Sequence, residues 1–136
     1  MQSISIESCT FNNILVTEST NFLFRFRGGA GNNDVTNGIS IRNSIFGPGW
    51  NTAGTATNNI RGKEGLPNTP IDIVNTYATN DWTFIATFEI AGFPSAIYPG
   101  GQSSLWVSPA TYNFNFKDSG FSGKYNAGDP RWRVKL

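Results

Sequence analysis

The stretch Ile39-Ser-Ile-Arg-Asn-Ser-Ile-Phe46 decides the fold, because its pattern occurs at three other places in the chain. An apolar, a polar and an apolar residue precede a variable residue, two small polar residues, another variable residue and usually phenylalanine. The other copies are Ile4-Ser-Ile-Glu-Ser-Cys-Thr-Phe11, Ile71-Asp-Ile-Val-Asn-Thr-Tyr-Ala78 and Phe114-Asn-Phe-Lys-Asp-Ser-Gly-Phe121. The four copies align without gaps, which is more agreement than alternation alone requires.

Each copy has the form of a short strand followed by a bend. The first three positions alternate as they do in a strand with one buried face. The small polar pair then suits a bend, where such side chains hydrogen-bond to nearby backbone. The copies begin at residues 4, 39, 71 and 114, and this spacing favours a repeating coil with long loops. The sequence predicts an all-β right-handed parallel β-helix with the four copies adjacent in one sheet; an antiparallel β-sandwich is the alternative.

Further elements are expected between the copies. The segment Asn21–Arg27 alternates strictly and predicts a strand with Phe22, Phe24 and Phe26 on one face and Leu23, Arg25 and Arg27 on the other. Asn37-Gly38 predicts a turn before the second copy. Composition assigns three more segments: a long loop from Gly47 to Pro70, a strand or strand pair over Trp82–Ile90, and a short strand over Leu105–Val107.

Composition limits the domain organisation and the partners. The 136 residues suit a single domain over 1–136, and only 14% are charged, with a net charge of +1. Such a surface does not attract nucleic acid or anionic membranes, and no apolar run reaches the ~20 residues of a membrane span. The segment after Met1 predicts a strand, so no signal peptide is expected within this chain.

The residue inventory restricts catalysis and metal binding. Histidine is absent, which excludes Ser-His-Asp and Cys-His catalysis and, with a single thiol, argues against zinc. Cys9 occupies the position of Ser44 and Thr76 in other copies and is interpreted as a small packed residue. The nine acids are scattered, so no catalytic residue is assigned. Asn32-Asn33-Asp34 offers oxygen ligands for Ca²⁺ but lacks partner acids, so no cofactor is expected.

The C-terminal third resembles a known family through Asp81-Trp82, Ser104-Leu-Trp-Val-Ser-Pro109, the copy at Phe114 and, most specifically, Ala127-Gly-Asp-Pro-Arg-Trp132. These motifs are similar to the C-terminal end of uncharacterised pectate-lyase-like β-helix proteins of glycan-degrading Gram-negative bacteria. The resemblance covers most of the chain and implies a secreted or cell-surface protein. It also implies that residues 1–136 are the last coils and the cap of a longer solenoid. It supplies no activity.

Four side chains are candidates for glycan contact. Trp50 and Trp82 follow Gly-Pro-Gly and Thr-Asn-Asp, and an indole held among Asn and Thr suits a sugar's apolar face. Arg25 and Arg27 offer bidentate donors to acidic sugars. The competing interpretation is that loop aromatics pin the loop and that the charges form a solvated face. Trp106 and Trp132 are expected to be structural.

These observations favour a non-catalytic, polysaccharide-associated β-helix end of a surface protein. Two alternatives stay open: the C-terminal part of a polysaccharide lyase or hydrolase with its active site upstream, and a structural cap or assembly domain. The strand at residues 3–7 would leave an open edge, and open edges recruit partners. Self-association through this N-terminal edge is therefore a further prediction.

Overall fold

The computed structural model describes residues 2–14, 22–26, 33–49, 59–84 and 86–136. In this part of the chain the protein is mostly β-strand, with one four-residue α-helix, α1 (Gln102–Leu105), and three 3-10 helices. The 3-10 helices are η1 (Ala86–Phe88), η2 (Pro109–Thr111) and η3 (Pro130–Trp132). None of the described helices is long and apolar enough to span a bilayer.

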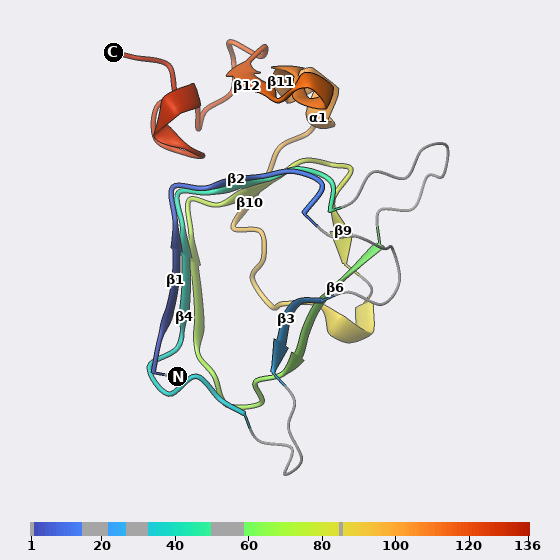
Figure 1. Ribbon diagram of the computed structural model, residues 1–136, viewed down its shortest axis with the longest axis vertical. Coiled ribbons are helices and arrows are strands. Elements are labelled where there is room, and N and C mark those ends of the chain that lie inside the picture. The colour runs from blue at the N-terminus through green and yellow to red at the C-terminus, as the bar shows by residue number, and fades with distance from the viewer. Residues whose placement is uncertain (1, 15–21, 27–32, 50–58, 85) are drawn as a thin grey trace.

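Three parallel sheets make up the body of the protein (Figure 1). The first contains β1 (Ile4–Glu7), β4 (Ile39–Arg42) and β7 (Ile71–Val74). The second contains β2 (Thr10–Phe11), β5 (Ile45–Phe46), β8 (Tyr77–Ala78) and β10 (Ala96–Ile97). The third contains β3 (Phe22–Phe26), β6 (Asn59–Gly65) and β9 (Thr83–Phe84).

The chain visits the three sheets in the same order three times, and we call each passage a circuit. The first circuit is β1, β2 and β3, the second β4, β5 and β6, and the third β7, β8 and β9. Residues Ile4, Ile39 and Ile71 are register partners, as are Ile6, Ile41 and Ile73. The first three copies of the repeat therefore lie parallel and in register, as predicted, and the described residues do not form the antiparallel sandwich.

The main core lies between the three sheets. Ile39 and Ile41 of the first sheet, Phe46 of the second and Phe24 of the third belong to one buried cluster. Phe46 stacks on Phe11 of the preceding circuit, with ring centres 4.5 Å apart. The isoleucines of the middle strand are 2% and 0% exposed. Each fully buried side chain of this size contributes about 1.5–3 kcal/mol, so the repeat builds the core by stacking identical positions.

The bend that joins the first sheet to the second has two features that recur in each of the three circuits. Ser8, Asn43 and Asn75 take the left-handed conformation, with φ of 57°, 51° and 46°. The next side chain then donates to the backbone carbonyl two residues earlier: Cys9 Sγ to Glu7, Ser44 Oγ to Arg42 and Thr76 Oγ1 to Val74, at 3.2, 2.8 and 3.0 Å. Cys9 therefore takes the place of a hydroxyl residue in the bend, as the repeat predicted, but it is partly exposed whereas Ser44 and Thr76 are buried.

The bends of successive circuits are also bonded to one another. Asn75 Nδ2 donates to Asn43 Oδ1 at 2.9 Å, and the N–H of Cys9 donates to Ser44 Oγ at 3.2 Å. Asparagine tolerates positive φ better than most residues and carries an amide that bonds to a neighbour. The small polar pair of the repeat thus fixes each bend and joins it to the next.

The fourth copy of the repeat does not join the first sheet, which corrects the sequence-based prediction. Its strand, β12 (Asn113–Phe116), pairs antiparallel with β11 (Trp106–Ser108) in a separate two-stranded sheet. Pro109 begins η2, and Tyr112 ends it at φ 63°, so the chain reverses before β12. An alternating pattern predicts a strand but does not specify its partner strand. Here the turn at Pro109 to Tyr112 sets the antiparallel pairing of β12 with β11.

Three other expectations need correction. The predicted long loop contains β6, a seven-residue strand, because backbone pairing with β3 and β9 holds it without an alternating apolar pattern. In the described residues of the segment Trp82–Ile90, the short strand β9 and then η1 replace the expected strand or strand pair. In β3, Leu23 packs against the same core as Phe24 and Phe26, so the predicted division into two faces is incomplete. The predicted turn at Asn37-Gly38 is present, with Gly38 at φ 86°.

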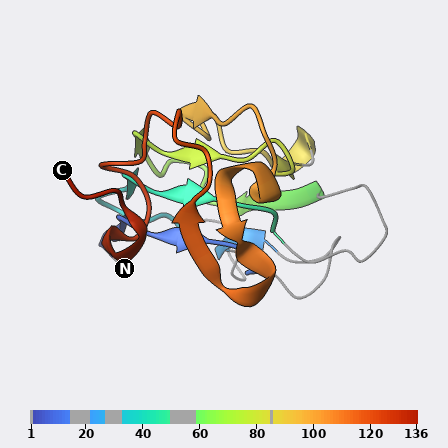
Figure 2. The same ribbon diagram turned by 90° about the horizontal axis from the view of Figure 1, so that it is seen from above.

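The C-terminal segment, residues 102–136, lies across the outer side of the second sheet (Figures 1 and 2). Ile45 of the second sheet packs there with Trp106 and Phe121 in a second buried cluster. The N–H of Gly128 donates to the carbonyl of Asn43 at 2.8 Å. This segment therefore covers a flank of the circuits, and Trp132 contacts Phe114, with ring centres 6.0 Å apart.

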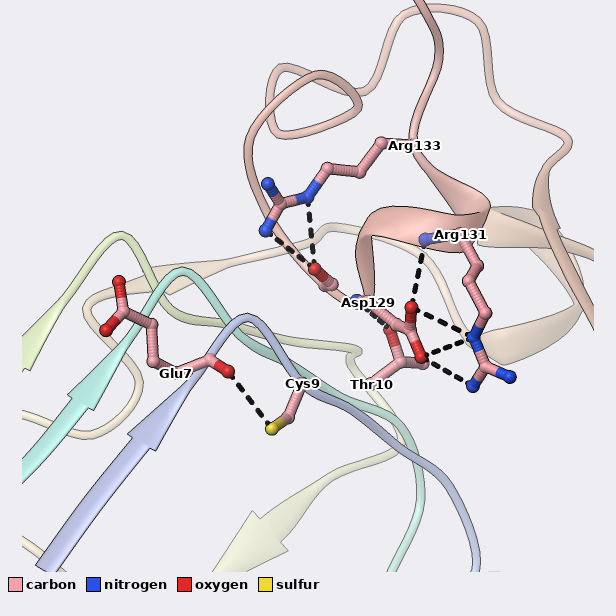
Figure 3. Close-up of polar contacts among 7 residues, drawn as sticks. Glu7, Cys9, Thr10, Asp129, Arg131 and Arg133 are labelled. Carbon is pink, nitrogen blue, oxygen red and sulfur yellow. Dashed lines mark hydrogen bonds and ion pairs between the residues drawn. The ribbon is translucent and has the colours of Figure 1, made fainter.

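Polar contacts fasten the same segment to the first circuit (Figure 3). The N–H of Asp129 donates to Thr10 Oγ1 at 2.9 Å. Arg131 donates to the Asp129 carboxylate with Nε and Nη2, and these bonds lower the pKa of Asp129. Arg133 Nη2 donates to the carbonyl of Gly128 at 2.8 Å. Residues at the two ends of the sequence are thus joined directly.

Substitutions at Asn43 test the bend. Asn43→Ala replaces a residue that tolerates positive φ with one that tolerates it less well, and it removes the acceptor of Asn75, so we expect a loss of about 2 kcal/mol in unfolding free energy. Asn43→Gly removes the same acceptor without the steric cost, so we expect a loss of about 1 kcal/mol. Urea unfolding measures both. A glycine variant that is less stable than the alanine variant would contradict this account of the bend.

Tyr98 gives the fold an alkaline pH dependence. Burial, with the hydrogen bond to Asp118, raises the pKa of Tyr98 to about 12. The unfolded value is about 10, so the neutral phenol stabilises the fold fully below ~pH 10 and this contribution disappears as the pH approaches ~12. We expect Tyr98→Phe to lose about 1 kcal/mol at pH 8 and to show a shallower decline above pH 10. Equal slopes for both proteins in urea titrations would refute this.

Candidate functional site

The four predicted glycan contacts do not meet in one described site. Trp50 and Arg27 lie outside the described residues. Trp82 lies in the main core, and Arg25 lies on the third sheet. The structure therefore does not bring Trp82 and Arg25 together as a binding surface.

Trp82 is a core residue, which corrects its assignment as a surface aromatic. The side chain is 8% exposed. Its ring lies 5.2 Å from that of Phe46 and 5.6 Å from those of Phe84 and Phe93, measured between centres. With aromatic neighbours around it, the indole has no free face for a sugar. The Thr-Asn-Asp turn before it positions the ring inward instead of presenting it to solvent.

Arg25 remains half-exposed but is already paired. Its Nε donates to Glu64 Oε2 at 3.1 Å across β3 and β6. Its guanidinium carbon also lies 5.5 Å from the centre of the Phe22 ring. An exposed pair of this kind contributes at most about 1 kcal/mol, so a stronger acceptor can compete for the guanidinium.

A groove of about 710 Å³ lies between the end of β2 and the C-terminal segment. Its volume falls within the ~300–1,000 Å³ of typical small-ligand sites. None of the described residues that line it is Asp, Glu, Lys, Arg or His. They are polar amides and hydroxyls mixed with apolar groups: Asn12, Asn13, Gln102, Ser103, Val107, Ser108, Pro109, Ala110, Tyr112 and Phe114.

Fixed hydrogen bonds hold the amide side of the groove. Asn12 Nδ2 donates to Gln102 Oε1 at 3.3 Å, which joins the first circuit to α1. The N–H of Gln102 donates to Asp81 Oδ2 at 3.1 Å. Asn12 Oδ1 is buried without a partner, and a Cβ at Gly47 would come within 2.5 Å of it. Only glycine at position 47 allows this close approach.

Tyr112 is the exposed aromatic at the groove. The residue is 79% exposed, and its backbone is left-handed, with φ 63° and ψ 26°. A bulky residue in this conformation is strained by about 1–2 kcal/mol. Such strain is retained where the surrounding structure enforces it and is frequent at binding sites. Val107, which is 51% exposed, adds a second apolar group to the groove.

Packed aromatic rings support the groove from below. Phe114 lines it and meets Trp106 edge to face, with ring centres 5.1 Å apart. Trp106 is fully buried, as predicted for a structural residue. Because the support is a packed core, the lining residues on β11 and β12 are held on a rigid base.

In the described part of the candidate Ca²⁺ segment, the Asp34 carboxylate already accepts structural hydrogen bonds. Asp34 Oδ1 accepts from the N–H of Asn68 at 2.8 Å and from Thr69 Oγ1 at 2.9 Å. Although desolvation opposes it, these bonds lower the pKa of Asp34. Among the described residues, no group of three His, Cys, Asp or Glu lies close enough to hold a metal ion.

Comparisons with protein-family models, with curated proteins and with solved structures give no match to this chain. The chemistry of the site therefore rests on its own geometry.

The arrangement suits hydrogen bonding to a neutral, polyhydroxylated ligand. Amides and hydroxyls both donate and accept, as sugar hydroxyls do. An exposed ring stacks on the apolar face of a sugar. Sequence reasoning expected this chemistry around an indole and missed Tyr112. The available signal was a tyrosine in the Pro109–Asn113 turn, and its exposure depends on the unpredicted hairpin.

The core position of Trp82 has a direct consequence. Trp82→Ala removes a buried ring and leaves a cavity, so we expect a loss of about 3–5 kcal/mol in unfolding free energy. Val107→Ala serves as the control, and for a half-exposed side chain we expect a change within about 0.5 kcal/mol. Urea unfolding measures both. A Trp82→Ala protein as stable as the parent would contradict the core position of this indole.

Proposed function

We propose that the protein binds saccharide chains without cleaving them, in the groove between the first circuit and the C-terminal segment. The observation that carries this proposal is Tyr112, an exposed and strained aromatic beside a lining that holds amides and hydroxyls but no described charged residue. A neutral lining favours ligands that are themselves neutral and hydrogen-bonding. The affinity expected for one stacked ring and a few hydrogen bonds is in the micromolar to millimolar range.

We further propose that the circuits are coils of a right-handed parallel β-helix. The repeated visit to three parallel sheets and the register of the first three repeat copies support this. Crossovers between parallel strands of one sheet are right-handed in about 98% of cases, which supports the hand. In this proposal the C-terminal segment shields the flank of the coils and forms one wall of the saccharide groove.

Tyr112→Gly tests the binding role. Glycine removes the ring and relieves the left-handed strain, so we expect binding of a neutral hexasaccharide hit to weaken at least about tenfold. The melting temperature should stay the same or rise, because the strain of about 1 kcal/mol disappears. A glycan array identifies the hit, isothermal titration calorimetry gives the affinity, and scanning calorimetry gives the melting temperature.

Two control variants separate stacking from folding. Tyr112→Phe retains the ring and should bind within about threefold of the parent. Tyr125→Ala removes another exposed tyrosine, 43% exposed and outside the groove lining, and should bind as the parent does. An array without hits would contradict the proposal, and so would undiminished binding by Tyr112→Gly.

We also propose that the protein pairs with a second copy through β1. The N–H of Ile4 donates to the carbonyl of Gly38, just before β4, at 3.1 Å, and the N–H of Ser8 donates to the carbonyl of Arg42, the last residue of β4, at 3.0 Å. The alternating N–H groups of Ser5 and Glu7 therefore face the open side, where no described residue pairs with β1. Ile4 and Ile6 are partly exposed, whereas their partners Ile39 and Ile41 are buried. The open edge of β1 therefore leaves apolar side chains partly exposed and backbone N–H groups without a partner among the described residues.

A symmetric antiparallel pair fits this edge best. Residues 3–7 contain no Lys or Pro to block pairing. With Ser5 on a two-fold axis, Ile4 faces Ile6 of the second copy and Glu7 faces a serine, so like charges do not meet. A two-fold contact also gives a closed dimer, whereas a head-to-tail contact can add further copies to a growing assembly.

Ser5→Pro tests this association, because it removes an N–H that the sheet does not use. We expect the parent to approach twice the 14.8 kDa of one chain at high concentration and Ser5→Pro to remain monomeric with unchanged circular dichroism. Ile97→Lys is the control on β10, the edge strand of the second sheet on the side away from the first circuit, where Ile97 is 71% exposed. Light scattering that shows a monomeric parent, or open-ended growth blocked by Ile97→Lys, would overturn the symmetric pair.

A further inference from the structure

The strand β10 is an edge strand of the second sheet (Figure 1). The N–H of Ala96 donates to the carbonyl of Thr76 at 3.1 Å, and the N–H of Tyr98 donates to the carbonyl of Ala78 at 2.9 Å. The residue between them therefore directs its own N–H and C=O to the other side, where no described strand pairs with β10. Ile97 thus offers one backbone donor and one backbone acceptor beside a side chain that is 71% exposed.

A small pocket adjoins this edge. It has a volume of about 150 Å³, and Ile97, Tyr98 and Asp118 are among the residues that line it. Of the described residues that line it, Asp118 alone carries a charge. Sites for whole small ligands usually measure ~300–1,000 Å³, so this pocket suits a single side chain.

Neutral donors hold the Asp118 carboxylate. Tyr98 Oη donates to its Oδ2 at 2.7 Å, and the N–H of Gly120 donates to its Oδ1 at 2.8 Å. The bond from Tyr98, then that from Gly120, lower the pKa of Asp118, and attraction to Lys124 adds to them. The Lys124 amine, however, donates to the carbonyl of Ser119, and none of the ion pairs among the described residues includes Asp118. The pocket therefore presents a carboxylate with which an incoming cation can pair.

The edge and the pocket together specify two neighbouring residues of a bound segment. Side chains alternate between the faces of a strand, so a residue opposite Ile97 packs on the Ile97 side chain. The residue opposite Tyr98 then lies on the face from which Tyr98 reaches Asp118, and a lysine side chain is about as long as that of tyrosine. Pro94 and Pro99 flank the strand and lack the N–H that longer pairing needs. An antiparallel segment fits best, because one of its residues exchanges both backbone bonds with Ile97.

We propose that β10 binds an extended antiparallel segment of a partner protein that carries a basic residue followed by an apolar β-branched residue. The apolar residue exchanges two backbone hydrogen bonds with Ile97 and covers its exposed side chain. The basic residue before it lies opposite Tyr98 and pairs with Asp118 at the pocket. In strand addition of this kind, backbone bonds supply affinity and pockets supply the choice of side chain. The site shares no residue with the saccharide groove or with β1.

The experiment uses the full chain and three short peptides at low salt. The lysine peptide is acetyl-Thr-Lys-Val-Thr-amide. The norleucine peptide replaces its lysine with norleucine, and the N-methyl peptide carries a methyl group on the valine nitrogen. Nitrogen-15 spectra of the labelled protein follow the backbone amides. We expect the lysine peptide to shift the amides of Ile97 and Gly120 saturably and to leave that of Ser5, on the edge of the first sheet, unchanged.

The other two peptides separate the ion pair from the backbone pairing. Norleucine keeps the stem without the charge, so we expect about fivefold weaker binding, as for the loss of an exposed ion pair. Added salt should weaken binding of the lysine peptide and not of the norleucine peptide. The N-methyl group removes the donor to the Ile97 carbonyl and prevents close approach, so we expect binding to weaken at least about tenfold. Nα-acetyl-lysine amide offers the amine without a strand and should give no saturable shift at Ile97.

Two variants complete the design. Asp118→Asn keeps a hydrogen-bond acceptor but removes the charge, so it should bind the lysine and norleucine peptides equally. Asp72→Asn is the matched control, because Asp72 is also an exposed acid on an edge strand, β7; it should bind as the unaltered protein does. The peptide comparison on the unaltered protein decides the question if Asp118→Asn proves unstable.

Four results would overturn the proposal. They are the absence of a shift at Ile97, equal binding of the lysine and norleucine peptides to the unaltered protein, full binding of the N-methyl peptide, and a full response to Nα-acetyl-lysine amide. The last would show a site for a free amine in place of strand addition.

Discussion

The left-handed bend between the first and second sheets is the constraint on which the rest of the structure depends. At Ser8, Asn43 and Asn75 the backbone turns through positive φ, and the next side chain bonds to the carbonyl two residues earlier. The bend therefore has the same geometry in each circuit. Equal bends allow the isoleucines on one side and the phenylalanines on the other to stack on their counterparts. The core follows from this repetition.

The groove depends on the same bends through the C-terminal segment. That segment bonds to Asn43 and Asn75 on the bends and to Thr10 just after the first bend. Its attachment places Gln102 within hydrogen-bonding distance of Asn12 and sets the β11–β12 hairpin, which carries Tyr112, over the flank of the second sheet. A polar repeat position that fixes the fold therefore also positions the surface proposed to bind saccharide.

The sequence predicted those parts of the fold in which local pattern and long-range pairing agree. Ile4, Ile39 and Ile71 mark both the alternation and the register, so three copies of the repeat were placed correctly. Phe114 shows the same alternation, but its partner is set by the turn at Pro109 and Tyr112. The strand β6 has little apolar alternation and depends on its neighbours. Trp82 was misplaced because a polar turn before an indole does not specify which way the ring points. The neutral chemistry of the groove could be anticipated from composition, whereas its position required the hairpin.

The most direct test of the central claim is a nitrogen-15 titration of the labelled protein with a neutral hexasaccharide that follows the side-chain amides of Asn12, Asn13 and Gln102. These amides line the groove from both the first circuit and the C-terminal segment. We expect their signals and that of the Tyr112 backbone amide to shift together with one dissociation constant, while the Asn115 side-chain amide stays unchanged. Saturable binding that shifts other amides and leaves these four signals in place would contradict the proposed groove.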